Sequence, residues 1–195
     1  AHGISVTTVD SHEDGKADYN SEVATLASAG GDALAVIGYL DQGGKGIIEG
    51  ALDSGAFDTF ILSDGMIGNS LTDAFGDQLN KSFGSLPGST GEGASVFTDV
   101  AKAAGIDSSG PYTGESYDAA ALIVLAMQAG ASADRASIAN NVMAVANAPG
   151  NKIYPGELKK ALDLIAKGKE VDYEGATGVN FTEVGEAEGS FLEKE

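Results

Sequence analysis

The chain has 195 residues, of which 29 are acidic and 11 are basic, so its formal net charge is −18. Apolar residues make up 43% of the chain, enough to bury a core, which excludes global disorder. So few basic side chains exclude nucleic acid and anionic membrane surfaces as favourable partners, and the acidic excess indicates a solubility or salt-adaptation trait. The absence of cysteine excludes disulfides, thiol nucleophiles and zinc ribbons.

The first half of the chain alternates strand-like and helix-like patterns. Residues 4–9 predict a strand, and Asp18 is placed to cap a helix whose apolar face runs from Tyr19 to Ala27. A buried strand over 33–37, a helix over 47–52 ended by Gly55 and a strand over 57–62 follow. This β-α-β-α-β order predicts an α/β fold with a parallel sheet covered by helices on both sides.

The second half is predominantly helical in pattern. The Gly/Ser/Pro-rich stretch 84–93 is the best candidate for a linker between domains. Beyond it, helical stripes occur over 96–104, 138–145 and 158–165, and 117–128 is apolar nearly all round, which predicts a buried helix. The longest apolar run, 119–127, is nine residues, too short to insert in a membrane. Residues 176–193 return to strand and turn signals.

Two motifs resemble ion or phosphate loops and fail on inspection. Asp10, Asp14 and Asp18 have calcium-loop spacing, but the position that requires a bidentate glutamate is Ser21. The adjacent pair Gly44 and Lys45 follows a strand as in a phosphate-binding loop, but neither the preceding glycine nor the following Ser or Thr is present. We therefore predict no metal and no nucleotide cofactor.

Catalytic signatures are equally sparse. The sequence has no Gly-x-Ser-x-Gly motif, and its two histidines, His2 and His12, have no serine motif beside them. A triad assembled in space stays open as an alternative, because such triads are not defined by spacing. The prediction is that the chain is not an enzyme, with a small α/β enzyme as the alternative.

A binding signal remains at the ends of two predicted strands. Tyr39 follows the strand over 33–37, and Asp64 follows the strand over 57–62. In open parallel sheets, ligands bind beyond the carboxyl ends of the strands, so an aromatic ring and a carboxylate are expected in one crevice. The alternative is structural: Tyr39 covers the end of the sheet and Asp64 caps a turn before Gly65.

A series of segments in one order resembles the C-terminal part of the type I periplasmic binding proteins, the group of the leucine/isoleucine/valine-binding protein of branched-chain amino-acid ABC importers. The segments are DGKADYNSEVATLASAGGDALAVIGYLDQGGKGIIEGAL, FILSDGM, SGPYTGESYDAAALIVLAM and IYPGELKKALDLIAKGKEVDYEGATGVNFTEVGEAEG. Together they cover most of the chain.

The resemblance implies a two-lobed clamp that traps a ligand between its lobes. Residues 1–88 would form most of lobe two, 94–168 the helical share of an incomplete lobe one, and 169–195 the strands that return to lobe two. Tyr39 is similar to the family's cleft tyrosine, and Asp64 falls where an acidic residue meets the ligand's ammonium group. Tyr112 falls where lobe one contributes an aromatic wall.

The function that the resemblance implies is a periplasmic solute-binding protein that delivers an amino acid or similar small molecule to an ABC permease. A ligand-sensing receptor domain is the alternative within the same fold. The family's first-lobe half, with the groups that hold the ligand's carboxylate, has no counterpart here. We therefore expect a fragment whose exposed helices are covered by the missing N-terminal lobe, or by a swapped or dimeric partner chain.

Overall fold

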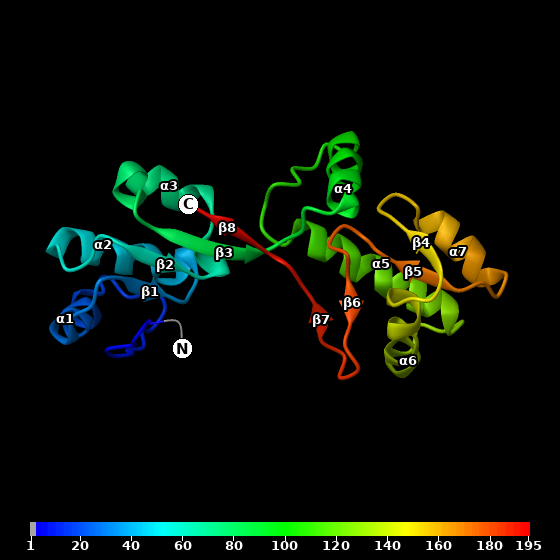
Figure 1. Cartoon of the computed structure of the whole chain (residues 1–195), viewed down its shortest axis with the longest axis horizontal. Coiled ribbons are helices and arrows are strands. Elements are labelled where there is room, and N and C mark those ends of the chain that lie inside the picture. Colours follow the sequence, from blue (N-terminus) through cyan, green and yellow to red (C-terminus); the bar gives the residue numbers. More distant parts are fainter. Residues whose placement is uncertain (1–2) are drawn as a thin grey trace. The chain divides into compact units, whose positions relative to one another are not determined.

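The computed structural model describes residues 3–195 and divides into two compact units, which are described separately (Figure 1). Unit 1 contains the chain up to Leu86 together with Glu193–Glu195, and unit 2 contains Pro87–Leu192. The first boundary falls within the Gly/Ser/Pro-rich stretch 84–93. Residues 169–192 lie in unit 2, where the strand at Val171–Tyr173 pairs and is buried in the core, and their assignment to lobe two stays a prediction.

Unit 1 is a parallel α/β unit, as predicted from the alternating pattern. One sheet has the strand order β1-β2-β3-β8, and β1 with β2 and β2 with β3 are parallel pairs. The elements are α1 (Asn20–Ala29), β1 (Leu34–Val36), α2 (Gly44–Ser54), β2 (Phe60–Leu62), α3 (Asn69–Phe75) and β3 (Phe83–Pro87), with 3-10 turns η1 (Leu40–Gln42), η2 (Asp64–Met66) and η3 (Gly76–Leu79). The boundary between the units falls within the last strand of the sheet, β8 (Phe191–Lys194).

The predicted parallel sheet flanked by helices is confirmed, but the described helices of unit 1 pack on one face of it and not on both. The buried strand side chains share one core cluster with helix residues: Leu34, Val36, Phe60, Leu62, Val23, Ile47, Ile48 and Leu71. The residues that alternate with them along the strands point the other way, and Ile37 is 82% exposed and Phe83 44% exposed. Successive right-handed crossovers that advance in one direction place their helices on the same face, so no described helix of unit 1 covers the second face.

Residues 4–9 do not form the predicted strand. The structure gives them no ladder hydrogen bonds, and the side chains of Ile4, Val6 and Val9 are each more than three-quarters exposed. A side-chain bond from Thr7 Oγ1 to the carbonyl of Gly30, 2.8 Å, fastens the segment instead. Alternating apolar residues predict a strand only where one face becomes buried, and here neither face does.

Unit 2 packs four helices with short strand pairs. Its elements are α4 (Glu92–Ala103), α5 (Thr113–Ala129), α6 (Arg135–Ala146), β4 (Asn151–Ile153), α7 (Leu158–Ala166), β5 (Val171–Tyr173), β6 (Asn180–Phe181) and β7 (Ala187–Glu188). Strands β4 and β5 pair in parallel, and β6 and β7 form an antiparallel pair. The largest core cluster of the unit joins α5, α6 and α7 to these strands through Leu122, Leu125, Ile153 and Tyr173.

The apolar helix α5 is buried on one side rather than all round. Leu125 and Ala126 are fully buried, whereas Ile123 is 47% and Val124 38% exposed. The helix was predicted to be wholly buried because its sequence is apolar on every face, but unit 2 supplies neighbours for one side only. Among the described residues, no helix combines the length and the hydrophobicity needed to cross a bilayer.

Candidate binding site

The carboxyl ends of β1 and β2 are joined by hydrogen bonds between the loops that follow them. The amide of Ser63 donates to the carbonyl of Val36 at 3.2 Å, and the amide of Gly38 donates to Ser63 Oγ at 3.3 Å. The first bond continues the backbone pairing to Ser63, and the second joins the Ser63 side chain to the backbone two residues beyond β1. They hold the two segments that carry Tyr39 and Asp64 side by side.

Tyr39 lies at the end of the first of these segments with its ring on the backbone of the second. A Cβ atom on Gly65 would stand only 2.8 Å from Tyr39 Cδ1 and would also clash with the carbonyl oxygen of Gly38. The glycine therefore leaves the space that the tyrosine ring occupies. The backbone carbonyl of Tyr39 accepts from the amides of Gln42 (3.2 Å) and Gly44 (3.1 Å), which fixes the turn into α2.

Asp64 opens the 3-10 turn η2 directly after β2. Its side chain is half-buried, and its Oδ1 accepts a hydrogen bond of 2.8 Å from the amide of Gly65. The structure thus brings Tyr39 and Asp64 to the same edge of the sheet, with Gly65 between them. Tyr39 remains 62% exposed, so its ring is available to a ligand. The roles of both side chains in binding stay predictions.

Tyr112 belongs to unit 2, where it immediately precedes α5. It adopts a left-handed backbone conformation, with φ 62° and ψ 11°, which is uncommon for a residue with a Cβ. Its carbonyl accepts the first bond of the helix, from the amide of Ser116 at 2.9 Å, and its side chain is 39% exposed. Its role as an aromatic wall of the ligand pocket stays a prediction.

The larger of the two main cavities, about 360 Å³, is not at this edge but in unit 2. Apolar side chains of α5 and the C-terminal strands line most of it, and its buried polar residue is Asp118. Both carboxylate oxygens of Asp118 are already engaged by protein donors, which are the Tyr173 hydroxyl, the amides of Ala176 and Thr177, and the Thr177 hydroxyl. A saturated carboxylate favours a structural role, so we do not assign this cavity to the solute.

Asp118 is a buried carboxylate that resembles a functional-site residue, and the search of the sequence for motifs did not identify it. Its signal in the sequence is a carboxylate in the second turn of α5, directly before the apolar run 119–127, a position where burial requires hydrogen-bond partners. Those partners come from residues 173–177, more than fifty positions later in the chain. Sequence spacing alone does not reveal such a contact.

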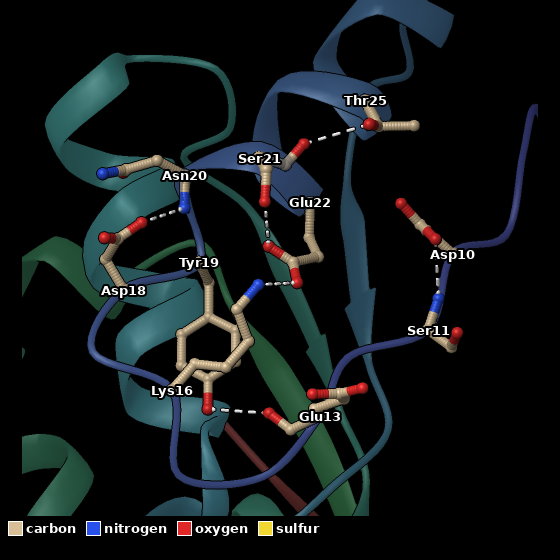
Figure 2. Close-up of polar contacts among 10 residues, drawn as sticks. All are labelled: Asp10, Ser11, Glu13, Lys16, Asp18, Tyr19, Asn20, Ser21, Glu22 and Thr25. Carbon is tan, nitrogen blue, oxygen red and sulfur yellow. Dashed lines mark hydrogen bonds and ion pairs between the residues drawn. The ribbon is translucent and has the colours of Figure 1, made fainter.

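A smaller cavity of about 150 Å³ lies in unit 1, beside the loop that precedes α1. His12 and Glu22 are among its lining residues. Figure 2 shows this loop, in which Lys16 forms an ion pair with Glu22 and reaches across the ring of Tyr19. The hydrogen bond from Lys16, with a second from Ser21, holds the pKa of Glu22 at about 2, well below its ordinary value.

The carboxylates of the segment that resembles a calcium loop have local partners in the structure. Within residues 3–195, no three histidine or carboxylate side chains lie close enough together to hold a metal ion. Asp10 and Asp18 instead bond to nearby backbone amides, those of Ser11 (2.9 Å) and Asn20 (3.1 Å) (Figure 2). The carboxylates of this segment therefore act as local turn and helix-start acceptors.

Comparison with known proteins shows which solved structures share this fold. No family model matches the chain. The structure is similar to the leucine-binding protein LivK of Thermotoga maritima, with a TM-score of 0.64 and 19% identity, over 92% of this chain and 45% of that one. It is also similar to a type 1 periplasmic binding protein of Bordetella pertussis, with a TM-score of 0.57 and 18% identity, over 91% of this chain and 50% of that one.

A curated relative adds sequence similarity over part of the chain. The substrate-binding protein BasB of a chemotactic signal transduction system in Halobacterium salinarum is 40% identical over 68 residues, which are 35% of this chain and 16% of that protein. The chain spans half or less of the length of each of these proteins. Two independent solved structures thus share the architecture described above, and the chain has the fold of a type I periplasmic binding protein.

Proposed function

We propose that this chain binds a small polar solute, an amino acid or a related molecule, as part of an extracytoplasmic receptor for an ABC importer. The observation that carries the proposal is the meeting of Tyr39 and Asp64 at the carboxyl ends of two adjacent parallel strands. That edge is where open parallel sheets bind their ligands. The fold, shared with a leucine-binding protein and a type 1 periplasmic binding protein, supports it.

The chemistry of the two side chains suits an amino acid. The Asp64 carboxylate, half-buried at the strand end, would accept a charge-assisted hydrogen bond from the ligand's ammonium group, worth about 1.5–3 kcal/mol. The exposed ring of Tyr39 would cover the ligand's apolar part and lose contact with water in doing so. We further propose that Tyr112 supplies a second aromatic wall, as the sequence resemblance implies. Neither role involves chemistry on the ligand.

The uncovered faces support a further partner. In unit 1 the second sheet face exposes Ile37 and Phe83, and in unit 2 α5 exposes Ile123 and Val124. Large apolar side chains left exposed on a sheet face or a helix face indicate a surface that another part of the protein covers. We propose that an N-terminal lobe, or failing that a swapped or second copy of the chain, covers these faces. An ABC permease would be the partner of the complete receptor.

A second candidate is a sensing role. BasB, the relative with 40% identity over 68 residues, belongs to a chemotactic signal transduction system. The same binding edge would then report solute to a transducer rather than to a permease. Co-purification of the complete receptor with solubilised membrane proteins would distinguish the two, since a permease and a transducer differ in mass and domain content.

Calorimetric titration with a panel of amino acids and small carboxylates tests the proposal. It should be run on the chain and on any longer natural protein that contains it. We expect one class of solute to bind, and Asp64→Asn to weaken its affinity at least tenfold, the equivalent of about 1.4 kcal/mol.

Asp41→Asn is the matched control. Asp41 is an exposed carboxylate in the loop that carries Tyr39, paired with Lys45 at 2.6 Å, and its loss should leave the affinity within about twofold. Failure of every panel member to bind, turnover of a panel member, or equal effects of the two substitutions would refute the proposal.

A further inference from the structure

His12 lies in the segment before α1, and its imidazole packs against both ends of the loop that carries Tyr39. A Cβ atom placed on Gly38 would stand 3.4 Å from His12 Cε1, and one placed on Gly43 would stand 3.1 Å from His12 Cδ2. These two glycines bracket residues 39–42. The His12 side chain is only 19% exposed, so the ring is held in the gap between them.

The imidazole is itself supported by a buried tyrosine. The rings of His12 and Tyr19 meet edge to face, with centroids 5.7 Å apart and planes at 80°. Tyr19 is 3% exposed, and its hydroxyl donates to the carbonyl of Glu13 at 3.2 Å (Figure 2). Its ring also occupies the space next to Gly43, where a Cβ would stand 2.8 Å from Tyr19 Cζ. The two rings therefore form one surface on which the loop rests.

Charged groups surround the rings of His12 and Tyr19, but the contacts with Gly38 and Gly43 are made by the rings themselves. The nearest to the imidazole is Asp14, whose Oδ1 lies 3.9 Å from His12 Nε2, and Glu22 lines the same small cavity. Lys16 is 5.7 Å from the centre of the Tyr19 ring and is engaged by Glu22. The ion pairs thus hold Tyr19 and its loop, whereas the contact with Gly38 and Gly43 is made by the rings.

The loop couples the position of the His12 ring to the position of Tyr39 in the candidate binding site. The carbonyl of Tyr39 accepts from the amides of Gln42 and Gly44, so residues 39–44 form a tight turn with little freedom of its own. The ring of Tyr39 rests on Gly65, next to Asp64. A shift of the backbone at Gly38 or Gly43 would therefore move the Tyr39 ring relative to the Asp64 carboxylate.

We propose that His12 is a positioning residue for the candidate site, and that its ring, packed between Gly38 and Gly43, sets the place of Tyr39 beside Asp64. The proposal rests on the proposed function for its consequence in ligand binding. The packing of His12 against the loop is independent of the proposed function, because the order of residues 38–44 can be measured without any ligand.

The chain contains no tryptophan, so Tyr39→Trp introduces a single fluorescent reporter at the loop itself. In that background, His12→Ala should shift the emission to longer wavelength and raise the acrylamide quenching constant about twofold, because the loop loses its support. His12→Phe, which keeps an aromatic ring and removes the nitrogens, should restore both signals. Lys16→Ala is the matched control: it removes a contact to Tyr19 but none to the loop, and both signals should stay unchanged.

Hydrogen exchange on the chain with native Tyr39 provides a second measurement, free of the reporter substitution. Peptides covering residues 38–46 should exchange about tenfold faster in His12→Ala than in the wild type, while peptides from α2 beyond residue 48 keep their protection. An unchanged loop in His12→Ala, equal effects of the Ala and Phe substitutions, or an equal effect of Lys16→Ala would each overturn the assignment.

Titration with L-leucine connects the loop to binding. His12→Ala should weaken its affinity about tenfold and His12→Phe less than about threefold, with the thermal unfolding temperature of both variants checked by circular dichroism. If the wild-type protein binds neither L-leucine nor any other member of the panel, that result counts against the proposed function alone, because fluorescence and exchange report the loop in the absence of ligand.

Discussion

The hydroxyl of Tyr173 donates a hydrogen bond of 2.9 Å to Oδ1 of Asp118, and both residues are at most 2% exposed. The bond joins β5 to α5 inside unit 2. The amide of Ala176 reaches the same oxygen at 2.8 Å, and the amide and hydroxyl of Thr177 reach Oδ2, each at 2.8 Å. One carboxylate thus satisfies four donors and fixes the turn after β5 to the start of the longest helix.

Replacing this carboxylate should destabilise unit 2 strongly. Asp118→Ala leaves the buried Tyr173 hydroxyl and the Ala176 amide without an acceptor, so we expect the free energy of unfolding to fall by about 3–5 kcal/mol. Urea denaturation followed by circular dichroism measures it. Asp163→Ala, which removes an exposed carboxylate of α7 paired with Lys159, should change the free energy by less than about 0.5 kcal/mol. A loss of similar size in both variants would contradict the prediction.

Tyr173 makes the stability sensitive to alkaline pH. Burial, reinforced by the nearby negative charge of Asp118, raises the pKa of the Tyr173 hydroxyl far above its ordinary value. Above the ordinary tyrosine pKa of about 10, the unfolded chain has lost a proton that the folded chain keeps. The free energy of unfolding should therefore be unaffected by this group at lower pH and should decrease as the pH rises above about 10.

Unfolding of the wild type and of Tyr173→Phe between pH 8 and about 11.5 tests this expectation. The variant should start from a lower stability, because Asp118 has lost a donor, and should then decline less steeply with pH. Parallel curves for the two proteins would show that another group is responsible.

The fold was predictable from the sequence where a pattern has a local cause. The helices near residues 47–52 and 158–165 follow apolar stripes, and Gly55 ends the first of them with a φ of 66°, as a helix-ending glycine does. Both parallel strands, and the placement of Tyr39 and Asp64 at their ends, follow from the βαβ alternation. These features depend on residues close together in the chain.

The incorrect predictions concern which surfaces of the strands and helices are buried. The strand expected over 4–9 has no ladder, the sheet of unit 1 has one bare face, and α5 is exposed at Ile123. In each case the sequence contains a surface fit for burial, but burial depends on a neighbour that the described residues do not supply. The role of Asp118 was missed for a similar reason, because its donors lie far along the chain.

Gly65 should resist substitution because the Tyr39 ring occupies the place of its side chain. In Gly65→Ala, the new methyl group would meet Tyr39 Cδ1 at 2.8 Å, so either the ring or the turn must move. We expect a loss of about 1–3 kcal/mol in unfolding free energy, measured by urea denaturation. Gly189→Ala is the control, since a Cβ there meets no atom within 4 Å. Equal stability of both variants would mean that the loop yields without cost.

The net charge of −18 predicts stabilisation by salt. Like charges repel one another in the compact state, and the screening length falls from about 10 Å at 0.1 M to about 3 Å at 1 M salt. The thermal unfolding temperature should therefore rise as KCl is raised over this range. Because hydrophobic burial is also salt-sensitive, sucrose at matched water activity serves as the comparison. A melting temperature that stays level or falls with KCl would contradict the charge argument.

The bare side of α5 should tolerate polar residues. Ile123→Lys replaces a side chain that is 47% exposed, and we expect a change in unfolding free energy within about 0.5 kcal/mol together with weaker binding of a hydrophobic dye. Leu125→Ala, at a fully buried position of the same helix, should lose about 2–5 kcal/mol. If Ile123→Lys destabilised the isolated chain as much as Leu125→Ala, the exposed face would have to be covered already.

The place of β8 in the sheet of unit 1 has a consequence for biosynthesis. Strand β8 is the neighbour of β3 in that sheet, yet in the chain it follows nearly the whole of unit 2. During translation, unit 2 leaves the ribosome as one continuous segment and is able to fold at once, while β3 waits as an open edge. The nascent chain thus carries an unpaired strand while the segment between β3 and β8 is synthesised, which is the interval in which a chaperone would protect it from misassembly.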